Sequence, residues 1–318
     1  MVPIDPEAGA YLDNLTRLGI RPVNELTPEQ AREVTLSAWP MLAGEMEPVA
    51  RREDRTIPGP QGPIPIRLLA PAANGSLPVL LYLHGGGWVT GNLDTHEVVC
   101  RGLANRAGCL VVAVDFRSAP DHRFPAAVED SWAALEWVAG LADSLGGDAS
   151  RLAVAGDSAG GNLAAVLALR ARSRGGPELR QQVLIYPVTD HDFDTPSYRT
   201  NATGYALTRD GMRWYWDHYA PDAGRRGHPD ASPLRAPDHT GVAPALIIVC
   251  EFDPLLDEGV AYAEALRHAG VPVRLIREEG MIHGYIRMPA LISRARKSWD
   301  DIAAALREAF RESTVPTR

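Results

Sequence analysis

Short apolar runs alternate with longer amphipathic segments along most of this 318-residue chain. Runs that are apolar at nearly every position and rich in β-branched residues predict strands buried on both faces, as in a parallel sheet covered by helices. Six such runs occupy residues 79–83, 110–115, 152–155, 183–186, 246–250 and 273–276. Helical spacing between and after them predicts helices at about residues 126–143, 158–173, 257–269 and 290–311.

The N-terminal segment has a different pattern. Apolar positions among its first residues have helical spacing, and Thr27, Pro28 and Gln30 have the order of an N-cap, a first-turn proline and a capping box. Two short helices are therefore expected before residue 45. Alternating apolar positions between residues 49 and 69 then predict two short strands, joined by a turn at residues 59–63, at one edge of the sheet.

Residues 190–240 interrupt the alternation of strands and helices. The segment is long, rich in proline and aspartate, and contains a cluster of aromatic residues: Tyr198, Tyr205, Trp214, Tyr215, Trp216 and Tyr219. We interpret it as an insertion, and its aromatic side chains as core of that insertion more than as a ligand site. The expected fold is therefore an α/β core over residues 49–318, with a mostly parallel eight-stranded sheet covered by helices on both faces. Residues 1–48 and the insertion at about 190–240 are expected to form a helical cap.

Charge and composition restrict the partners. The formal net charge is −8, and the basic residues are scattered along the chain, so the positive surface of a nucleic-acid binder is missing. Nucleic acid and anionic membranes are therefore not expected as partners. No apolar run reaches about 18 residues, which predicts no membrane-spanning helix. Asp5 and Glu7 stand where a targeting segment carries basic residues, so a cytoplasmic location is expected. Cys100, Cys109 and Cys250 form no CxxC pair and are expected to be buried free thiols.

The first chemical motif is Gly156-Asp157-Ser158-Ala159-Gly160, which directly follows one predicted strand and precedes a predicted helix. In this setting a GxSxG sequence forms a sharp turn that holds the serine hydroxyl clear of the sheet edge. The glycines leave room where side chains would clash. A phosphate-binding loop needs a lysine after its glycines, and Lys297, near the C-terminus, is the chain's one lysine. Ser158 is therefore the candidate nucleophile.

The second motif is His84-Gly85-Gly86-Gly87-Trp88, which follows the strand at residues 79–83. Three consecutive glycines let backbone N–H groups face a ligand without interference from a β-carbon. Two or more such donors can stabilise the negative charge of a tetrahedral intermediate. The N–H groups of Gly86, Gly87 and Ala159 are the candidates for this oxyanion hole.

A serine nucleophile needs a histidine base to take its proton, and the histidine needs a carboxylate to hold it. After a GxSxG turn, these three residues are expected in the order Ser, acid, His along the chain. His283 lies in a glycine-flanked loop after the last predicted strand, whereas the other downstream histidines lie in the insertion or on a helix. Asp253 follows the strand at 246–250 and precedes a proline that ends it. Asp257 and Glu258 remain alternatives for the acid, although carboxylates at a helix N-terminus are also common as caps.

A metal or cofactor is not implied by the sequence. His191-Asp192-Phe193-Asp194 could be taken for a metal cluster, but no second ligand pair has zinc-like spacing. We interpret this segment as a solvated loop.

Taken together, the motifs resemble those of the hormone-sensitive-lipase-like bacterial esterases, also called esterase family IV, within the α/β-hydrolase fold. The resemblance extends over about residues 50–310. Its blocks are HGGGW at 84–88, D-x-R-x-A-P through F-P-A-A at 115–127, GDSAGGN at 156–162, DPLLDE at 253–258 and MIHG at 281–284. The family pattern usually has other residues at Phe116, Ser118, Asp121 and Tyr285, and none of these positions has a proton-transfer role.

The resemblance implies a serine carboxylesterase that acts on short to medium acyl esters, with Ser158, His283 and Asp253 as a catalytic triad. It also implies a homodimer formed through the last strand. An amidase, formamidase or deacetylase with the same triad is an alternative, because the pocket chooses the leaving group. A ligand receptor on the same scaffold is disfavoured, since relatives of that kind lack the catalytic histidine.

Overall fold

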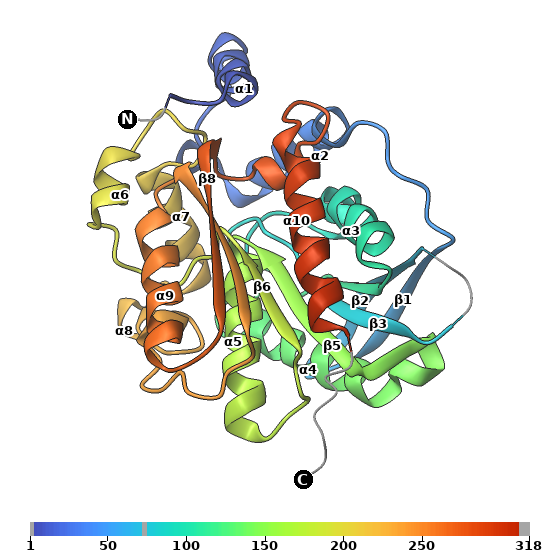
Figure 1. Cartoon of the computed structure of the whole chain (residues 1–318). Coiled ribbons are helices and arrows are strands. Elements are labelled where there is room, and N and C mark those ends of the chain that lie inside the picture. Colours follow the sequence, from blue (N-terminus) through green and yellow to red (C-terminus); the bar gives the residue numbers. More distant parts are fainter. Residues whose placement is uncertain (1–2, 72–74, 312–318) are drawn as a thin grey trace.

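In the computed structural model, which describes residues 3–71 and 75–311, an eight-stranded sheet runs through the molecule (Figure 1). The strand order is β1-β2-β4-β3-β5-β6-β7-β8, and β2 is antiparallel to both neighbours while all later pairs are parallel. The bounds are β1 Arg51–Gly59, β2 Gly62–Ala70, β3 Leu77–Leu83, β4 Leu110–Val114, β5 Gly147–Asp157, β6 Gln181–Ile185, β7 Ala245–Phe252 and β8 Val273–Ile282. The predicted mostly parallel sheet of eight strands is confirmed.

Helices cover both faces of this sheet, because its central strands are apolar on both sides. In β3, Leu81 and Leu83 face one hydrophobic core and Leu80 faces the other. The first core is closed by α4, α5 and α9, and the second by α3 and α10, which lie side by side in Figure 1. The helices are α1 Pro6–Arg17, α2 Pro28–Ala43, α3 Leu93–Ala107, α4 Ala126–Leu141, α5 Ala159–Arg174, α6 Pro196–Thr200, α7 Arg209–Tyr219, α8 Ala223–Arg226, α9 Leu256–His268 and α10 Arg294–Ala309.

Most predicted elements are present, and α2 begins at the expected capping box, where Thr27 and Gln30 bond to each other's backbone. The hairpin of β1 and β2 is also as predicted. The helix α3 was not predicted. It begins at a second capping box, formed by Asn92 and Thr95.

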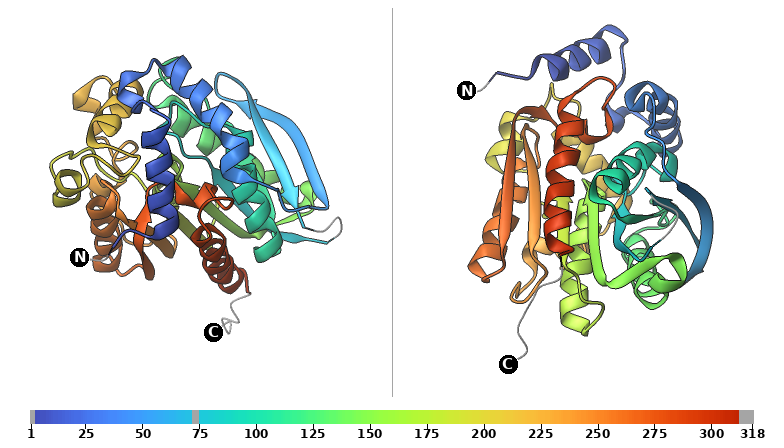
Figure 2. Two further views of the ribbon diagram at one scale, coloured as in Figure 1. Left: turned by 90° about the horizontal axis from the view of Figure 1, so that it is seen from above. Right: turned by 45° about the vertical axis from the view of Figure 1, so that its right-hand side comes forward.

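Two segments outside the sheet lie at the carboxyl ends of its parallel strands. Figure 2 shows α1 and α2 above this end of the molecule. The segment at residues 190–240 folds into α6, α7, α8 and a short 3₁₀ turn, Pro233–Arg235. Of the two predicted units, residues 1–2, 72–74 and 312–318 lie outside the described residues. The division into core and cap stays a prediction.

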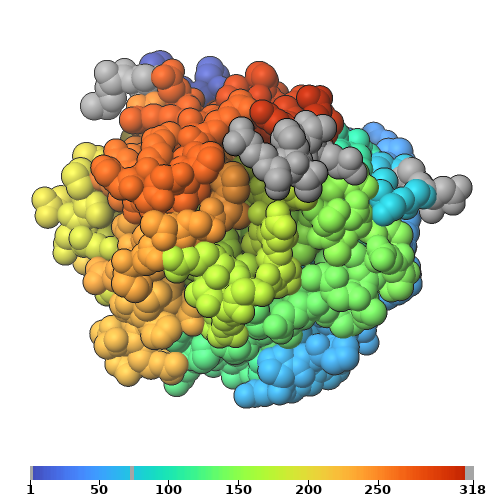
Figure 3. All heavy atoms as spheres, turned by 60° about the horizontal axis from the view of Figure 1, so that its bottom comes forward, coloured from blue at the N-terminus to red at the C-terminus, as the bar shows by residue number. Residues whose placement is uncertain are grey.

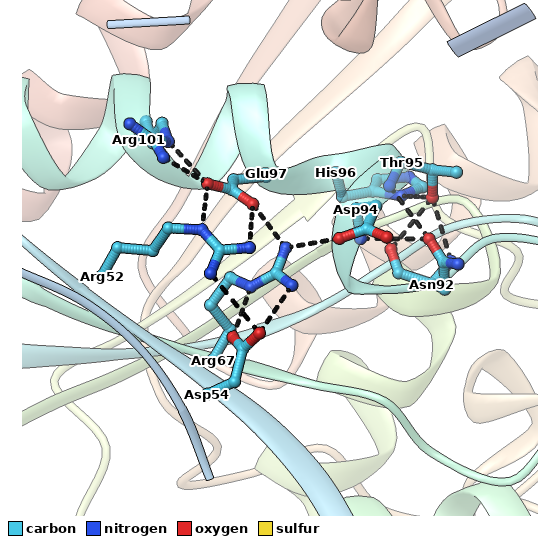
Figure 4. A network of polar contacts seen from close by, with 9 residues as sticks. All are labelled: Arg52, Asp54, Arg67, Asn92, Asp94, Thr95, His96, Glu97 and Arg101. Carbon is cyan, nitrogen blue, oxygen red and sulfur yellow. Dashed lines mark hydrogen bonds and ion pairs between the residues drawn. The ribbon is translucent and has the colours of Figure 1, made fainter. Parts of the chain in front are cut away.

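An ion network joins the β1–β2 hairpin to α3 (Figure 4). Arg67 of β2 donates to Asp54 at 2.7 Å and to Asp94 at 2.8 Å, and also to the buried Glu97. Glu97 further accepts from Arg52 and Arg101. Burial alone would raise the pKa of Glu97, but the hydrogen bonds from Arg52 and Arg101 lower it below its usual value.

The β1–β2 hairpin also contacts α4. In Figure 3 the light-blue atoms of the hairpin border the green segment that contains α4. Cys100, Cys109 and Cys250 are buried and free, as predicted. Among the residues that the structure describes, no helix combines the length and apolar character needed to cross a bilayer.

Candidate active site

Ser158 sits on a sharp turn between β5, which ends at Asp157, and α5, which begins at Ala159. Its φ of 56° lies in the left-handed region, where a non-glycine residue is strained. Close packing enforces the turn. A β-carbon at Gly160 would overlap the carbonyl group of Leu83, and one at Gly156 would overlap the backbone of Gly160. The strained serine and its two obligatory glycines therefore have the geometry that the GxSxG motif predicted.

His283 connects Ser158 to Asp253. Its Nε2 lies 3.0 Å from the Oγ of Ser158, and its Nδ1 lies 2.6 Å from Oδ2 of Asp253. The other carboxylate oxygen of Asp253 accepts from the backbone N–H of Leu255 at 2.9 Å, and the side chain is almost fully buried. A proton on Nδ1 therefore leaves Nε2 free to accept the serine hydroxyl proton. The loops after β5, β7 and β8 bring these three residues together at one edge of the sheet.

The alternative acids are engaged elsewhere. Oδ2 of Asp257 accepts from the backbone N–H of Ser197 at 2.7 Å, which ties α9 to α6. Oε1 of Glu258 accepts from the backbone N–H of Thr189 at 2.7 Å and of Asp190 at 3.3 Å. Within residues 3–71 and 75–311, Asp253 is the acid that bonds to His283.

The glycine-rich loop after β3 lies beside the serine. Gly86 and Gly87 have φ values of 116° and 58°, and the carbonyl of Gly86 accepts from the N–H groups of Val89 and Thr90 at 3.1 and 2.8 Å. This turn leaves the N–H groups of Gly86 and Gly87 without an acceptor in the described part of the chain. Both glycines line the same cavity as Ser158. Ala159, the third candidate, is fully buried as the first residue of α5.

Asp157, next to the nucleophile candidate, is buried and fixed by three partners. Tyr82 donates to Oδ1 at 2.8 Å and the N–H of Gly85 at 3.1 Å, while Nε2 of His96 lies 3.3 Å from Oδ2. Burial by itself raises the pKa of the Asp157 carboxyl, but the interactions with His96 and Tyr82 outweigh it and lower that pKa to about 2. Burial lowers the pKa of His96 below its usual value, although the nearby Asp157 carboxylate opposes this shift. Asp157 thus links β3, the glycine-rich loop and α3.

A cavity of about 180 Å³ lies over the serine and is lined in part by residues from both segments outside the sheet, the N-terminal helices and residues 190–240. Tyr11 comes from α1, Thr35 from α2 and Met212 and Tyr215 from α7. The remaining lining residues are Val23, Gly86, Gly87, Thr90, Gly91, His96, Asp157, Ser158, Val188, Ala206, Leu207, His283, Gly284, Arg287 and Met288.

The aromatic cluster of the insertion is mainly core, as expected. Trp216 and Tyr219 are buried and pack on Trp88, with ring centroids 5.0 and 4.0 Å away. Tyr215 is the exception, because it lines the cavity and contacts the position where Gly87 would carry a β-carbon. His191 departs from the solvated loop that the sequence predicted. It is half-buried, and its Nδ1 lies 3.1 Å from the hydroxyl oxygen of Ser232.

Comparison with known proteins agrees with this geometry. A family model described as alpha/beta hydrolase fold matches residues 80–287, which contain the serine, aspartate and histidine. The chain belongs to the α/β-hydrolase family. This α/β hydrolase is 45% identical over 272 residues to the carboxylesterase NlhH of Mycobacterium tuberculosis, covering 84% of this chain and 85% of the relative. It is 38% identical to an ethyl acetate hydrolase of Pseudomonas putida, covering 96% and 99% of the two chains.

Solved structures extend the comparison to the whole α/β hydrolase. A thermostable esterase from Pseudomonas putida has a TM-score of 0.94 at 38% identity, covering 98% of this chain and 99% of that one. A hyperthermophilic esterase from Pyrobaculum calidifontis has a TM-score of 0.91 at 42% identity, covering 96% and 98%. The resemblance to hormone-sensitive-lipase-like esterases is confirmed.

Several lining residues of this α/β hydrolase were not singled out by the sequence. His96, which lines the cavity, and Tyr82, which is buried behind it, both contact Asp157 and carry no motif of their own. Arg287 ends the 3₁₀ turn that follows the loop of His283, and it belongs to no motif that the sequence singled out. The nearness of Arg287 to the histidine in sequence was the one available signal.

Proposed function

We propose that this α/β hydrolase cleaves carboxylic esters with short to medium acyl chains, with Ser158 as nucleophile, His283 as general base and Asp253 as its orienting acid. The observation that carries the proposal is the continuous contact from Asp253 through both ring nitrogens of His283 to the Ser158 hydroxyl. The relatives named carboxylesterase and ethyl acetate hydrolase support an ester as the bond that is cleaved. The protein is accordingly a serine carboxylesterase.

In the first half of the reaction, the Oγ of Ser158 attacks the ester carbonyl carbon while Nε2 of His283 takes the hydroxyl proton. The imidazolium that results is stabilised by the Asp253 carboxylate on its other side. Collapse of the tetrahedral intermediate breaks the bond to the alcohol oxygen, and His283 returns the proton to that oxygen. Water then attacks the acyl-enzyme with the same base, which releases the acid and restores Ser158.

The N–H groups of Gly86, Gly87 and Ala159 are proposed to bind the negative oxygen of the intermediate. Two facts support this role: the first two donors have no acceptor in the described residues, and Ala159 starts a helix, where N–H groups are unpaired. The positive end of the α5 dipole adds to the stabilisation. The loss of one such donor typically lowers kcat about 10²–10³-fold.

The size of the cavity supports small acyl groups, because α1, α2 and α7 close it over the serine. The test is a series of aryl esters from acetate to decanoate. We expect kcat/KM to peak at short to medium chains, and Ser158→Ala to lose more than about a thousandfold while keeping the wild-type circular dichroism spectrum. Wild-type turnover in the Ser158→Ala protein would overturn the proposal.

Two further measurements separate the alternatives. A matched ester and anilide pair is expected to show the larger kcat/KM for the ester, and the reverse order would make the enzyme an amidase. An aryl phosphonate is expected to add covalently to Ser158, detected by intact mass, and not to Ser158→Ala. The homodimer through β8, the cytoplasmic location and the assignment of residues 1–48 and 190–240 to a cap stay predictions from the sequence.

A further inference from the structure

Arg287 supplies a positive charge inside the cavity that contains Ser158, and it forms no ion pair within residues 3–71 and 75–311. Its side chain also makes no hydrogen bond there, and its Nη1 is buried without a partner. A buried guanidinium N–H without an acceptor is unfavourable, because the group has lost water and gained nothing in exchange. Most arginines of this chain, by contrast, are paired with carboxylates, as Arg67 and Arg170 are.

The backbone that carries Arg287 is fixed. It belongs to the 3₁₀ turn Tyr285–Arg287, directly after the loop of His283. The hydroxyl group of Tyr285 bonds to Ser298 at 2.7 Å, and the indole N–H of Trp299 donates to the carbonyl of Ile286 at 3.1 Å. Both partners lie on α10. The guanidinium is therefore held near the reacting groups by the same packing that places His283, so it is prepared in advance for a ligand.

Asp157 is the carboxylate that could act as the counter-charge of Arg287 in place of a ligand. It lines the same cavity, and the charge of Arg287 contributes a small part of the lowering of its pKa. However, its carboxylate already has Tyr82, Gly85 and His96 as partners, and it lies beyond ion-pair distance of the guanidinium. The guanidinium N–H groups therefore remain available to a molecule in the cavity.

We propose that Arg287 is a specificity-determining residue that binds a carboxylate of the substrate, so that this enzyme prefers esters that carry an anionic group at a distance from the scissile bond. The inference rests on the ester hydrolysis proposed above. A guanidinium binds a carboxylate through two parallel hydrogen bonds, which a neutral ester cannot supply. The chain has a net charge of −8, so a local cation is needed to attract an anionic substrate.

The test compares anionic esters with neutral amide analogues of the same shape. For a charge on the alcohol side, the pair is 4-acetoxybenzoate and 4-acetoxybenzamide; for a charge on the acyl side, it is monoethyl adipate and ethyl adipamate. We expect Arg287→Met to lower the ratio of kcat/KM, anion over neutral, by about tenfold or more in at least one pair. The effect should lie mainly in KM, because the contact is present equally before and in the transition state. Arg287→Lys should keep part of the preference.

Arg274→Met is the matched control. It removes the same charge from an exposed site at the start of β8, roughly 25–30 Å along the strand from His283. The anion-to-neutral ratio should stay at its wild-type value in this variant. A ratio that changes less than twofold in Arg287→Met in both pairs, or that falls equally in Arg274→Met, overturns the inference. If the wild type turned over no ester at all, the proposed function would have failed instead, and Ser158→Ala distinguishes the two cases.

Discussion

Arg32 of α2 donates from Nε to the carbonyl oxygen of Val89 at 3.0 Å, so the N-terminal helix is bonded to the loop that carries the glycines of the candidate oxyanion hole. The same guanidinium donates to the carbonyl of Ala119 and to Asp121, both at 2.8 Å. Arg32 therefore joins three segments that come from distant parts of the chain. Asp121, one of the positions that depart from the family pattern, is one of its partners.

Replacement of Arg32 by methionine is expected to lower kcat/KM for a neutral aryl ester by about tenfold, because the loop of Gly86 and Gly87 loses its support and small shifts of catalytic donors are costly. Steady-state kinetics measure the effect. Arg17→Met is the control, since Arg17 is exposed and, among the described residues, its side chain bonds to Asn14 of its own helix alone. Equal kinetics in the two variants would contradict the anchoring role.

Loss of the Asp253 carboxylate is expected to lower kcat much more than loss of the nearby Asp257 carboxylate. Asp253→Asn leaves the shape intact but favours the wrong tautomer of His283, and a loss of about 10³–10⁴ in kcat is expected. Asp257→Asn, four residues later, should retain most activity because that carboxylate caps α6 and does not contact the histidine. Comparable losses in both proteins would show that the acid has been assigned incorrectly.

The site could be predicted from the sequence to the extent that its geometry is local. A turn that needs Gly156 and Gly160, or a loop that needs positive φ at Gly86 and Gly87, leaves its requirement in the residues themselves. The strand–turn–helix context then indicated which end of the sheet carried the chemistry. Asp253 and His283 were found because each follows a recognisable strand.

Other features depend on packing that a pattern does not contain. In α3, His96 and Glu97 are buried together with the apolar residues, so the helix lacks a clear polar face and was missed. The end of β8 was missed because Glu278 and its neighbours interrupt the apolar run. Glu278 is nevertheless buried, with Arg294 and Ser298 of α10 as its partners. Tyr215 and Arg287 reach the cavity only through the tertiary fold.

A β-carbon at Gly86 is expected to damage the candidate oxyanion hole. It would overlap the carbonyl of Thr90 and is disfavoured at φ 116°, so Gly86→Ala should lower kcat by about 10²-fold or more. Gly108→Ala is the matched control. Gly108 also has positive φ, at the end of α3, but its β-carbon would meet open space. That variant should lose stability without a comparable loss of kcat, and a large loss of kcat in it would argue against a specific effect at Gly86.

Glu97 is expected to be a main contributor to the stability of the hairpin contact. Glu97→Gln leaves Arg52, Arg67 and Arg101 with one counter-charge fewer, and Arg67 is buried, so a destabilisation of about 3 kcal/mol is expected in urea unfolding. Glu53→Gln is the control. Glu53 is partly exposed and pairs with Arg51 and Arg55, and its loss should cost less than about 1 kcal/mol. A similar loss of unfolding free energy in Glu97→Gln and Glu53→Gln would contradict the larger contribution of Glu97.

The ionised Asp157 is expected to make stability depend on acid pH. Its pKa of about 2 in the folded protein lies below the usual value of 3.8, so the carboxylate contributes stability that is complete above about pH 4 and is lost as the pH falls toward 2. For a fully buried group this difference corresponds to about 2 kcal/mol. Asp157→Asn should therefore be less stable than the wild type at pH 7, and the gap should narrow between pH 4 and pH 2.5.

Urea unfolding of both proteins across this pH range isolates the contribution, because the other carboxylates titrate equally in each. Asp143→Asn, which removes an exposed carboxylate, controls for the change in net charge and should show a small gap at every pH. The stabilising groups are Tyr82 and His96, so Tyr82→Phe should raise the pKa of Asp157 and shift the acid transition to higher pH. A gap between wild type and Asp157→Asn that stays constant from pH 7 to pH 2.5 would mean that folding does not lower the pKa of the Asp157 carboxyl.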